Sequence, residues 1–141
     1  MFMIDKILVP IDGSENSEKG LKHACWLANK VDGTLTVLYV APIPFTGESA
    51  AFPIEPLLEA GQKFLDKAKQ IVKNEKCVDT HFVLREASGN PAHEIVNFAK
   101  EKGFSLIVMS AKGHSALKHL LLGSVSDTVT KHAPCSVLIV K

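Results

Sequence analysis

The chain has 141 residues, of which 46% are hydrophobic, and its 16 lysine and arginine residues against 15 aspartate and glutamate residues give a formal charge of +1. This length fits one domain with a sizeable core, and the apolar content excludes a disordered chain. A nearly neutral chain whose only arginine is Arg85 has no general electrostatic attraction for nucleic acid or for a membrane surface. We therefore expect neither as a partner.

The three cysteines, Cys25, Cys77 and Cys135, are far apart and show no CxxC spacing. This pattern favours reduced thiols over a disulfide framework or a zinc site. The apolar N-terminal stretch is interrupted by Asp5 and Lys6 and lacks the features of a signal peptide, and no apolar run approaches the roughly 18 residues of a membrane span. We expect a soluble protein of the cytoplasm.

The first half of the chain alternates strand and helix signals. Residues 6–11 form a continuous apolar run that predicts a strand, and apolar positions at helical spacing predict a helix over residues 17–30. The β-branched residues of the stretch 34–40 predict the second strand. Prolines predict an irregular loop over residues 41–53, and a long apolar stripe predicts a helix over residues 54–74.

The second half continues the alternation. Asn90 followed by Pro91 is typical of a helix cap with proline in the first turn. An unusually long connection, residues 110–123, precedes the last helix, although strand-to-helix connections ordinarily have about 2–6 residues. The predicted elements are a strand over 80–84, a helix over 91–102, a strand over 105–109, a helix over 124–132 and a strand over 136–140.

Apolar strands that alternate with helices indicate an open parallel sheet of five strands with helices on both faces, a Rossmann-like α/β fold in one domain over residues 1–141. Ligands of such sheets bind beyond the carboxyl ends of the strands, where the strand order reverses. Two loops carry suitable residues there, namely residues 12–14 after the first strand and residues 110–123 after the fourth. They share one crevice if the sheet order is 3-2-1-4-5.

The long connection has the residue types of a phosphate site. Gly113 and Gly123 allow a ligand to approach the backbone and allow angles that a β-carbon forbids. The N–H groups at the start of the last helix attract an anion, because they coincide with the positive end of the helix dipole. Ser124 and Ser126 add hydroxyl donors at the same place.

Charged side chains complete this pattern. Lys112, His114 and Lys118 would add positive charge, and Asp12 on the facing loop would contact a ribose hydroxyl or a magnesium ion. An alternative remains open, in which the two glycines only form a turn and a helix entry and the serine is a plain helix cap. The sequence has no GxxxxGK[ST] or GxGxxG motif, which argues against P-loop and nicotinamide-type sites, and its histidines share no metal-ligand spacing.

Four stretches together resemble the universal stress protein family over essentially the whole chain. They are KILVPIDGSENSEKGLKHA, LTVLYV, GNPAHEIVNFAKEKGFSLIVMSAKG and LLGSVSDTVTKHAPCSVLIVK. Nucleotide-binding members of this family carry a glycine, two residues, a second glycine, nine residues and then Gly-Ser or Gly-Thr. In this sequence the motif corresponds to Ser110, Gly113, Gly123 and Ser124, with the nine-residue spacing intact.

The resemblance implies a five-stranded sheet of order 3-2-1-4-5 that binds ATP, or AMP or ADP, across the two loops. It implies that Asp12 approaches the ribose or the phosphates, where magnesium would accompany the nucleotide, and that backbone near Val40 meets the adenine. It further implies a homodimer through the last strand, residues 136–140. The residues that it places around the nucleotide are Pro10, Ile11, Asp12, Val40, Met109, Ser110, Lys112, Gly113, His114, Gly123, Ser124, Val125 and Ser126.

Two positions depart from the family pattern. Ser110 stands where the first motif glycine is expected, and Ser105 stands where many members have aspartate. Members without the glycine motif often do not bind ATP, so the first departure bears on function, whereas the second concerns the packing of a loop. Serine at position 110 would cost about 1–3 kcal/mol if the backbone needs a positive φ, and less if only close approach is needed.

We interpret the sequence as a small cytosolic ATP-binding protein that acts as a stress-response or regulatory module. The main alternative is an ATP-independent dimeric interaction module of the same fold. An enzyme that acts on an adenylated substrate is a third candidate. No catalytic constellation is evident in the sequence, so we expect slow ATP hydrolysis at most.

Overall fold

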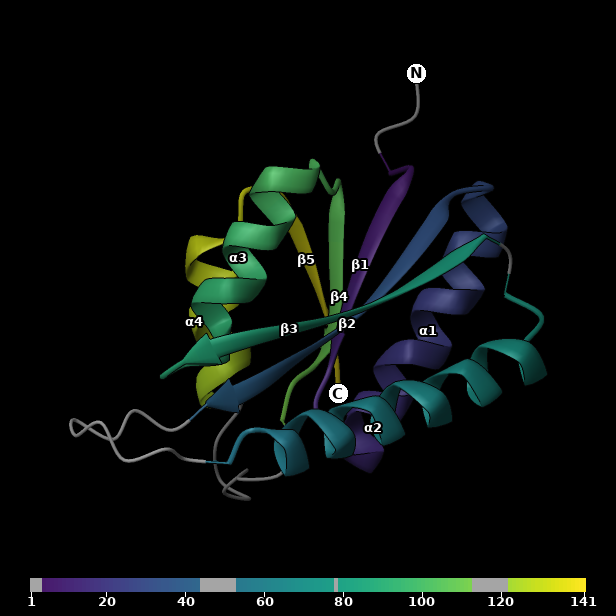
Figure 1. The fold of residues 1–141 in the computed structure, drawn as a ribbon. Coiled ribbons are helices and arrows are strands. Elements are labelled where there is room, and N and C mark those ends of the chain that lie inside the picture. The colour runs from purple at the N-terminus through teal and green to yellow at the C-terminus, as the bar shows by residue number, and fades with distance from the viewer. Residues whose placement is uncertain (1–3, 44–52, 78, 113–121) are drawn as a thin grey trace.

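The computed structural model describes residues 4–43, 53–77, 79–112 and 122–141. Five strands and four helices alternate along the part of the chain that it describes (Figure 1). The elements are β1 (Lys6–Ile11), α1 (Glu15–Val31), β2 (Thr34–Ile43), α2 (Glu55–Asn74), β3 (Thr80–Ser88), α3 (Pro91–Lys102), β4 (Leu106–Ser110), α4 (Ser124–His132) and β5 (Ser136–Val140).

The five strands form one sheet in the order β3-β2-β1-β4-β5, and every neighbouring pair is parallel. This confirms the predicted fold class and strand order. The chain reverses its direction of progress across the sheet at β1, which lies between β2 and β4. The carboxyl ends of the strands and the start of α4 lie at the same end of the molecule, at the bottom of Figure 1.

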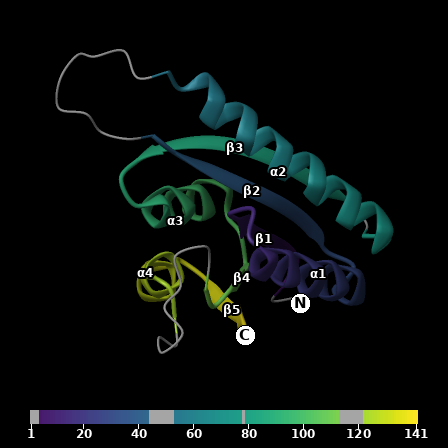
Figure 2. The same cartoon turned by 90° about the horizontal axis from the view of Figure 1, so that it is seen from below.

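Helices cover both faces of the sheet and separate two apolar cores. Figure 2 shows α1 and α2 on one side of the sheet and α3 and α4 on the other. Ile7 and Val9 of β1 belong to the core under α1 and α2, whereas Leu8 between them belongs to the core under α3 and α4. This alternation follows from the two-residue period of a strand, and it explains why the central strands are apolar at every position.

Both β2 and β3 extend further than the sequence patterns predict. The prediction ended β2 at residue 40 and began a loop at residue 41, but the parallel register between the two strands continues to the pair Ile43↔Ser88. Pairing with β1 already ends at Tyr39. Pro42 therefore needs no N–H group toward a second neighbour, and proline is tolerated in a strand that is locally an edge.

Ser105 fixes the start of β4 against the start of β1. Its hydroxyl oxygen accepts hydrogen bonds from the backbone N–H groups of Asp5 and Lys6, each at 3.1 Å. The same hydroxyl can donate to the Lys6 carbonyl or to an Asp5 carboxylate oxygen, each 3.1 Å from the hydroxyl oxygen. The prediction that this departure from the family pattern concerns loop packing agrees with these contacts, which lie at the amino ends of the strands.

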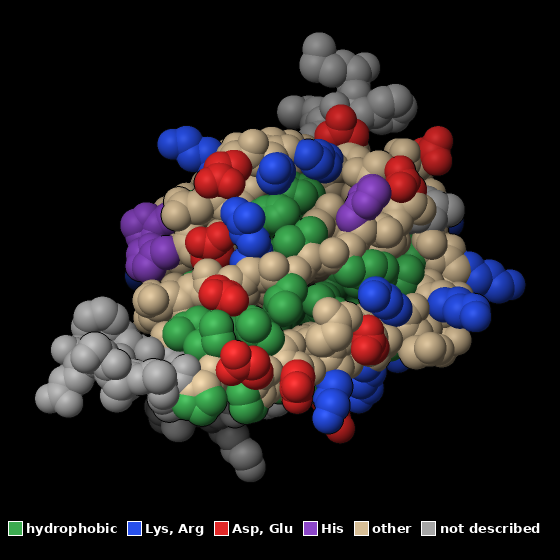
Figure 3. All heavy atoms as spheres, viewed as in Figure 1, with side chains coloured by type: hydrophobic (Ala, Val, Ile, Leu, Met, Phe, Trp, Pro, Cys, Tyr) green, Lys and Arg blue, Asp and Glu red, His purple; other side chains and the backbone are tan. Residues whose placement is uncertain are grey.

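The last strand lies at an edge of the sheet, as the sequence analysis predicts. Val137 and Ile139 pack against the core under α3 and α4, whereas the side chain of Leu138 is 41% exposed on the other face. On the face in Figure 3, acidic and basic side chains are interspersed, so this face carries no field of one sign. Among the helices that the structure describes, none has the length and apolar character needed to cross a membrane.

Candidate functional site

The loop after β1 places a carboxylate at the carboxyl edge of the sheet. The backbone N–H of Ser14 donates a hydrogen bond to Oδ1 of Asp12 at 2.9 Å, which fixes the turn. The hydroxyl oxygen of Ser14 then caps α1 by accepting from the N–H of Ser17 at 3.1 Å. These bonds hold Asp12 in place directly beyond the central strand.

Gly13 is required in this loop for two physical reasons. Its φ is +85°, a left-handed conformation that residues with a β-carbon rarely adopt. A β-carbon at this position would also lie 2.5 Å from the ring of Phe64 in α2. Phe64 in turn packs on Tyr39, with ring centroids 5.4 Å apart, so the ring is held from two sides.

The paired register of β1 and β4 ends early, although both strands continue. The pairs are Ile7↔Leu106 and Leu8↔Ile107, in the first half of each strand. Leu8↔Ile107 is the last pair of the two strands, although β1 continues to Ile11 and β4 to Ser110. This is the expected position of the ligand crevice in an open parallel sheet, where one strand connects to the left and the next to the right.

Ser110 occupies an ordinary strand conformation at the end of β4. Its φ is not positive, and its hydroxyl donates a hydrogen bond to the carbonyl of Lys112 at 3.0 Å. A glycine could be needed at this position for a positive φ or for close approach of a ligand. The observed backbone conformation removes the first of these reasons. Serine costs no left-handed strain, and its side chain turns into its own loop.

The carbonyl of Ala111 ties the start of α4 to the end of β4. It accepts hydrogen bonds from the backbone N–H of Gly123 at 2.7 Å and from the hydroxyl of Ser126 at 2.6 Å. Ala111 itself donates its N–H to the carbonyl of Val140 at 2.9 Å. Ser126 is 3% exposed, and its hydroxyl is engaged in the frame of the site in this structure, while its predicted role as a donor to the ligand stays a prediction.

The helix α4 begins without a side-chain cap. Its N-cap residue is Gly123, and the first backbone bond of the helix runs from the N–H of Asp127 to the carbonyl of Gly123 at 2.9 Å. The N–H groups of Ser124, Val125 and Ser126 precede that bond, as the unpaired donors at the start of any helix do. By contrast, side chains cap α1 and α3, where Ser14 and Asn90 accept from backbone N–H groups.

Gly123 has no conformational need to be glycine. Its φ of −73° and ψ of 169° are accessible to every residue, which corrects the expectation that this position requires angles forbidden to a β-carbon. Close approach of another group to the backbone remains as the physical reason for glycine. Because the cap residue itself has no side chain, the N–H groups at the start of α4 are suited to bind an anion.

The remaining predicted site residues lie around these two loops. Pro10 and Ile11 end β1, and Val40 and Met109 are each 6% exposed and pack in the core under α3 and α4. Lys112 is half-buried beyond the end of β4. Gly113 and His114, together with Lys118, lie outside the described residues.

Tyr39 and Phe64 are neighbours of the site that the sequence patterns do not reveal. Burial raises the pKa of the Tyr39 hydroxyl, and the nearby charge of Asp12 adds to the rise. Tyr39 is in β2 and Phe64 is in α2, so only the packing of α2 across the sheet brings them together near residues 12–14. Aromatic residues inside apolar stripes are ordinary core residues, and the sequence carries no signal that distinguishes these two.

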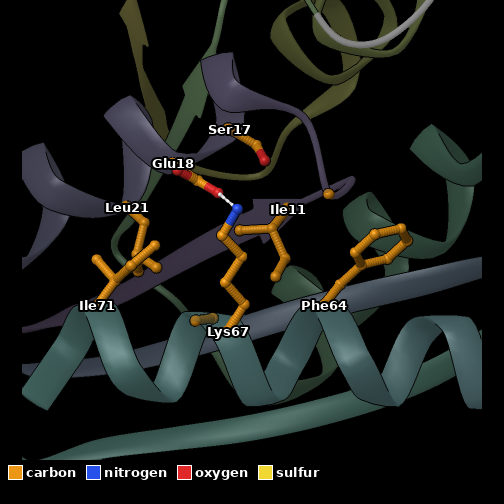
Figure 4. A pocket seen from close by; sticks show the side chains of 9 residues that line it. Ile11, Ser17, Glu18, Leu21, Phe64, Lys67 and Ile71 are labelled. Atoms are coloured by element: carbon orange, nitrogen blue, oxygen red, sulfur yellow. Dashed lines mark ion pairs between the residues drawn. The ribbon is translucent and has the colours of Figure 1, made fainter.

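A small hollow beside the site lies between α1 and α2 (Figure 4). Lys67 reaches across it and pairs with Glu18 at 2.7 Å. The hollow has a volume of about 20 Å³, enough for roughly one water molecule and too small for a nucleotide. The described residues contain no group of three His, Cys, Asp or Glu that could hold a metal by themselves.

Comparison with known proteins agrees with this arrangement. The model of the universal stress protein family matches residues 3–141. The universal stress protein MJ0531 of Methanocaldococcus jannaschii is 41% identical over 141 residues, which span 96% of this chain and 81% of that protein. The universal stress protein YxiE of Bacillus subtilis is 39% identical over 151 residues, with 99% and 100% of the two chains covered.

Two solved structures of nucleotide complexes share the fold. A universal stress protein in complex with cAMP has a TM-score of 0.75 at 24% identity and covers 99% of both chains. The universal stress protein from Archaeoglobus fulgidus in complex with dAMP has a TM-score of 0.76 at 22% identity, covering 99% of this chain and 100% of that one. The family match over nearly the whole sequence and the two relatives at 41% and 39% identity establish that the chain belongs to the universal stress protein family.

Proposed function

We propose that this protein binds an adenine nucleotide in the crevice beyond the carboxyl ends of β1 and β4. The observation that carries the proposal is the uncapped start of α4, which the Ala111 carbonyl holds at the end of β4. Asp12 directly follows the end of β1, which neighbours β4 in the sheet. A cluster of outward N–H groups on one side and a carboxylate on the other matches a phosphate group joined to a ribose.

The phosphates would bind at the start of α4. The backbone N–H groups of Ser124 and Val125 would donate to phosphate oxygens, and the missing side chain of Gly123 would let them approach. Lys112 would add positive charge from the end of β4, and Gly113 and His114 complete the set of residues that we assign to the phosphates. Ser126 would contribute by holding the helix in place through Ala111.

The nucleoside would lie over the open side of β2. Past Tyr39, β2 pairs with β3 alone, so backbone groups near Val40 on the β1 side are available to the adenine edge. Asp12 would accept from a ribose hydroxyl or bind magnesium held by the phosphates. A single carboxylate fits that ion, because magnesium in nucleotide sites keeps one or two carboxylates together with phosphate oxygens and water.

ATP is the ligand that we assign to the site, with AMP or ADP as the other adenine nucleotides that fit. The cAMP and dAMP complexes of the two fold relatives support an adenine nucleotide as the class. The ordinary backbone conformation of Ser110 supports binding despite the altered motif. We assign the protein a regulatory role in the stress response in the cytoplasm, where the free state of its three cysteines fits a reducing compartment.

We also propose a homodimer through β5. The strand lies at the edge of the sheet and presents Leu138, which is 41% exposed. An apolar edge strand is a template for pairing, and pairing with its own copy across a twofold axis would cover both the backbone groups and this side chain.

The second candidate function is an ATP-independent dimeric interaction module. It is favoured by one observation, the hydroxyl of Ser110, which closes onto the Lys112 carbonyl within the loop itself. In that case the loop after β4 completes the fold, and the exposed edge of β5 is the functional surface. The two functions differ in whether nucleotide is bound at all.

Mass spectrometry of the gently purified protein tests the proposal. We expect an adenine nucleotide to be released on denaturation from the wild-type protein and to be absent from Gly123→Val prepared in the same way. Released nucleotide from both proteins would contradict binding at α4. Absence from both, together with no binding of added ATP, would favour the interaction module.

A further inference from the structure

Two cysteines that are distant in the sequence come together in the core under α1 and α2. Cys25 lies in α1 and is fully buried, with 0% of its surface exposed. Cys77 follows the end of α2, is partly exposed and packs against the cluster that contains Cys25. The sequence predicts separate thiols, and only the packing of α2 beside α1 brings the pair together.

The turn that carries Cys77 is fixed against the same region of α1. The backbone N–H of Cys77 donates to the Val72 carbonyl at 3.0 Å, and Lys76 adopts a positive φ of 53°. The side chain of Asn29 donates to the carbonyl of Lys76 at 3.2 Å. Asn29 is one helical turn beyond Cys25, so this bond holds the turn beside the helix face that Cys25 occupies.

The pKa values of the two thiols shift in opposite directions. Hydrogen bonds from Cys25 and, to a lesser extent, from Thr80 lower the pKa of Cys77, although burial opposes this. The hydrogen bond to Cys77 raises the pKa of Cys25, and burial adds to the rise. Cys25 therefore keeps its proton and donates it toward Cys77, and the more accessible sulfur carries the thiolate character that oxidation requires.

We propose that Cys77 and Cys25 form a peroxide-oxidised dithiol site, in which Cys77 is the attacked sulfur and Cys25 closes the disulfide. The order follows from exposure, because hydrogen peroxide can reach the partly exposed Cys77, whereas Cys25 has no exposed surface. The contact between the two residues supplies the partner that the oxidised sulfur needs.

The reaction balances with hydrogen peroxide as the oxidant. The Cys77 thiolate attacks one peroxide oxygen, so that an S–O bond forms, the O–O bond breaks, and the departing hydroxide takes a proton to become water. The Cys25 sulfur then attacks the sulfur of the Cys77 sulfenic acid, so that an S–S bond forms and the S–O bond breaks. The second hydroxide takes the Cys25 proton and leaves as water.

Cys135 supplies a matched control within the same chain. It is partly exposed like Cys77, but it packs against the other core, and burial raises its pKa. We therefore expect a thiol-alkylating reagent at pH 7 to modify Cys77 at least several-fold faster than Cys135. Peptide mass spectrometry after short exposure measures both rates in one sample.

The direct experiment treats the full-length wild-type protein with hydrogen peroxide and maps disulfides without reduction. We expect a Cys25–Cys77 disulfide that also forms in Cys135→Ser and is absent from Cys77→Ser. In Cys25→Ala, a reagent that traps sulfenic acids should label Cys77. The disulfide closes a long loop, so we expect the oxidised wild type to melt about 5 °C or more above the reduced protein.

Other results would overturn the site. A disulfide that includes Cys135 or joins two chains, or oxidation of Cys77 to sulfinic acid without a disulfide in the wild type, would show that Cys25 is not the partner. Equal alkylation rates at Cys77 and Cys135 would show that Cys77 has no special reactivity. The disulfide map of the peroxide-treated wild type tests the proposal even if Cys25→Ala fails to fold.

Discussion

Gly13 and Gly89 separate backbone strain from steric clash at matched positions. Their φ values are +85° and +86°, but a β-carbon at Gly13 meets Phe64, whereas one at Gly89 meets nothing described within 4 Å. We expect Gly89→Ala to cost about 1 kcal/mol in the free energy of unfolding, from the left-handed backbone alone. Gly13→Ala should cost about 1–3 kcal/mol more, because the Phe64 ring must shift.

Urea unfolding of the two alanine variants measures this difference. Equal losses of stability would show that Phe64 yields without cost and that the loop after β1 is not locked by α2. A larger loss at Gly13 would show that the loop that carries Asp12 is held in place before any ligand binds.

Ser110 gives the second prediction at this scale. Because its backbone is unstrained and its hydroxyl faces the Lys112 carbonyl, we expect Ser110→Gly to tighten ATP binding by less than about tenfold. Without ligand, glycine in the strand should lower the free energy of unfolding by roughly 0.5–1 kcal/mol. Calorimetric titration of both proteins with ATP is the measurement. Binding by the glycine variant alone would show that the serine closes the site.

The start of α4 is the element on which the proposed function depends. Gly123→Val keeps an allowed backbone, since φ is −73° and ψ is 169°, but it places a branched side chain in front of the N–H groups of the first turn. We expect an unchanged circular dichroism spectrum and loss of ATP binding. Asn90→Val is the matched control, because it removes the side chain that caps α3 by accepting from the N–H of Ala92 at 2.9 Å. This variant should bind ATP like the wild type.

The edge strand β5 carries the proposed dimer. Leu138→Lys places a charge on an exposed position without disturbing Val137 and Ile139, which pack in the core. We expect monomers at micromolar concentration in sedimentation, because the buried ammonium groups of two copies would repel each other. His81→Lys is the control. It adds the same charge at an exposed position of β3, at the opposite edge of the sheet, and this variant should remain dimeric. A Leu138→Lys dimer, or a wild-type monomer, would contradict this interface.

The elements show what the sequence could predict. Apolar runs and apolar positions at helical spacing identified the strands and helices, and the placement of candidate ligand-binding residues after the first and fourth strands predicted the strand order. The sequence could not predict the extension of β2 through Pro42, because proline is unfavourable there until β1 has ended. Contacts between distant elements, such as Phe64 over Gly13 and Cys77 beside Cys25, leave no pattern along the chain.

At the scale of the whole molecule, the fold combines a rigid sheet with a carboxyl edge where two loops meet. The β3–β2 pairing runs through nine residues of β3, whereas β1 and β4 pair at Ile7↔Leu106 and Leu8↔Ile107, so the sheet is least continuous beside the proposed site. A ligand that bridges the loop after β1 and the start of α4 would add contacts where the strands contribute few. Binding should therefore raise the stability of the whole domain.

Thermal melting with and without magnesium and ATP tests the central claim most directly. At about 100 times its dissociation constant a ligand adds roughly 2.7 kcal/mol, which for a domain near this size raises the melting temperature by about 5–10 °C. We predict this rise for the wild type and for Asn90→Val, and no rise for Gly123→Val. No rise in the wild type at millimolar ATP, or an equal rise in Gly123→Val, would contradict nucleotide binding at the start of α4.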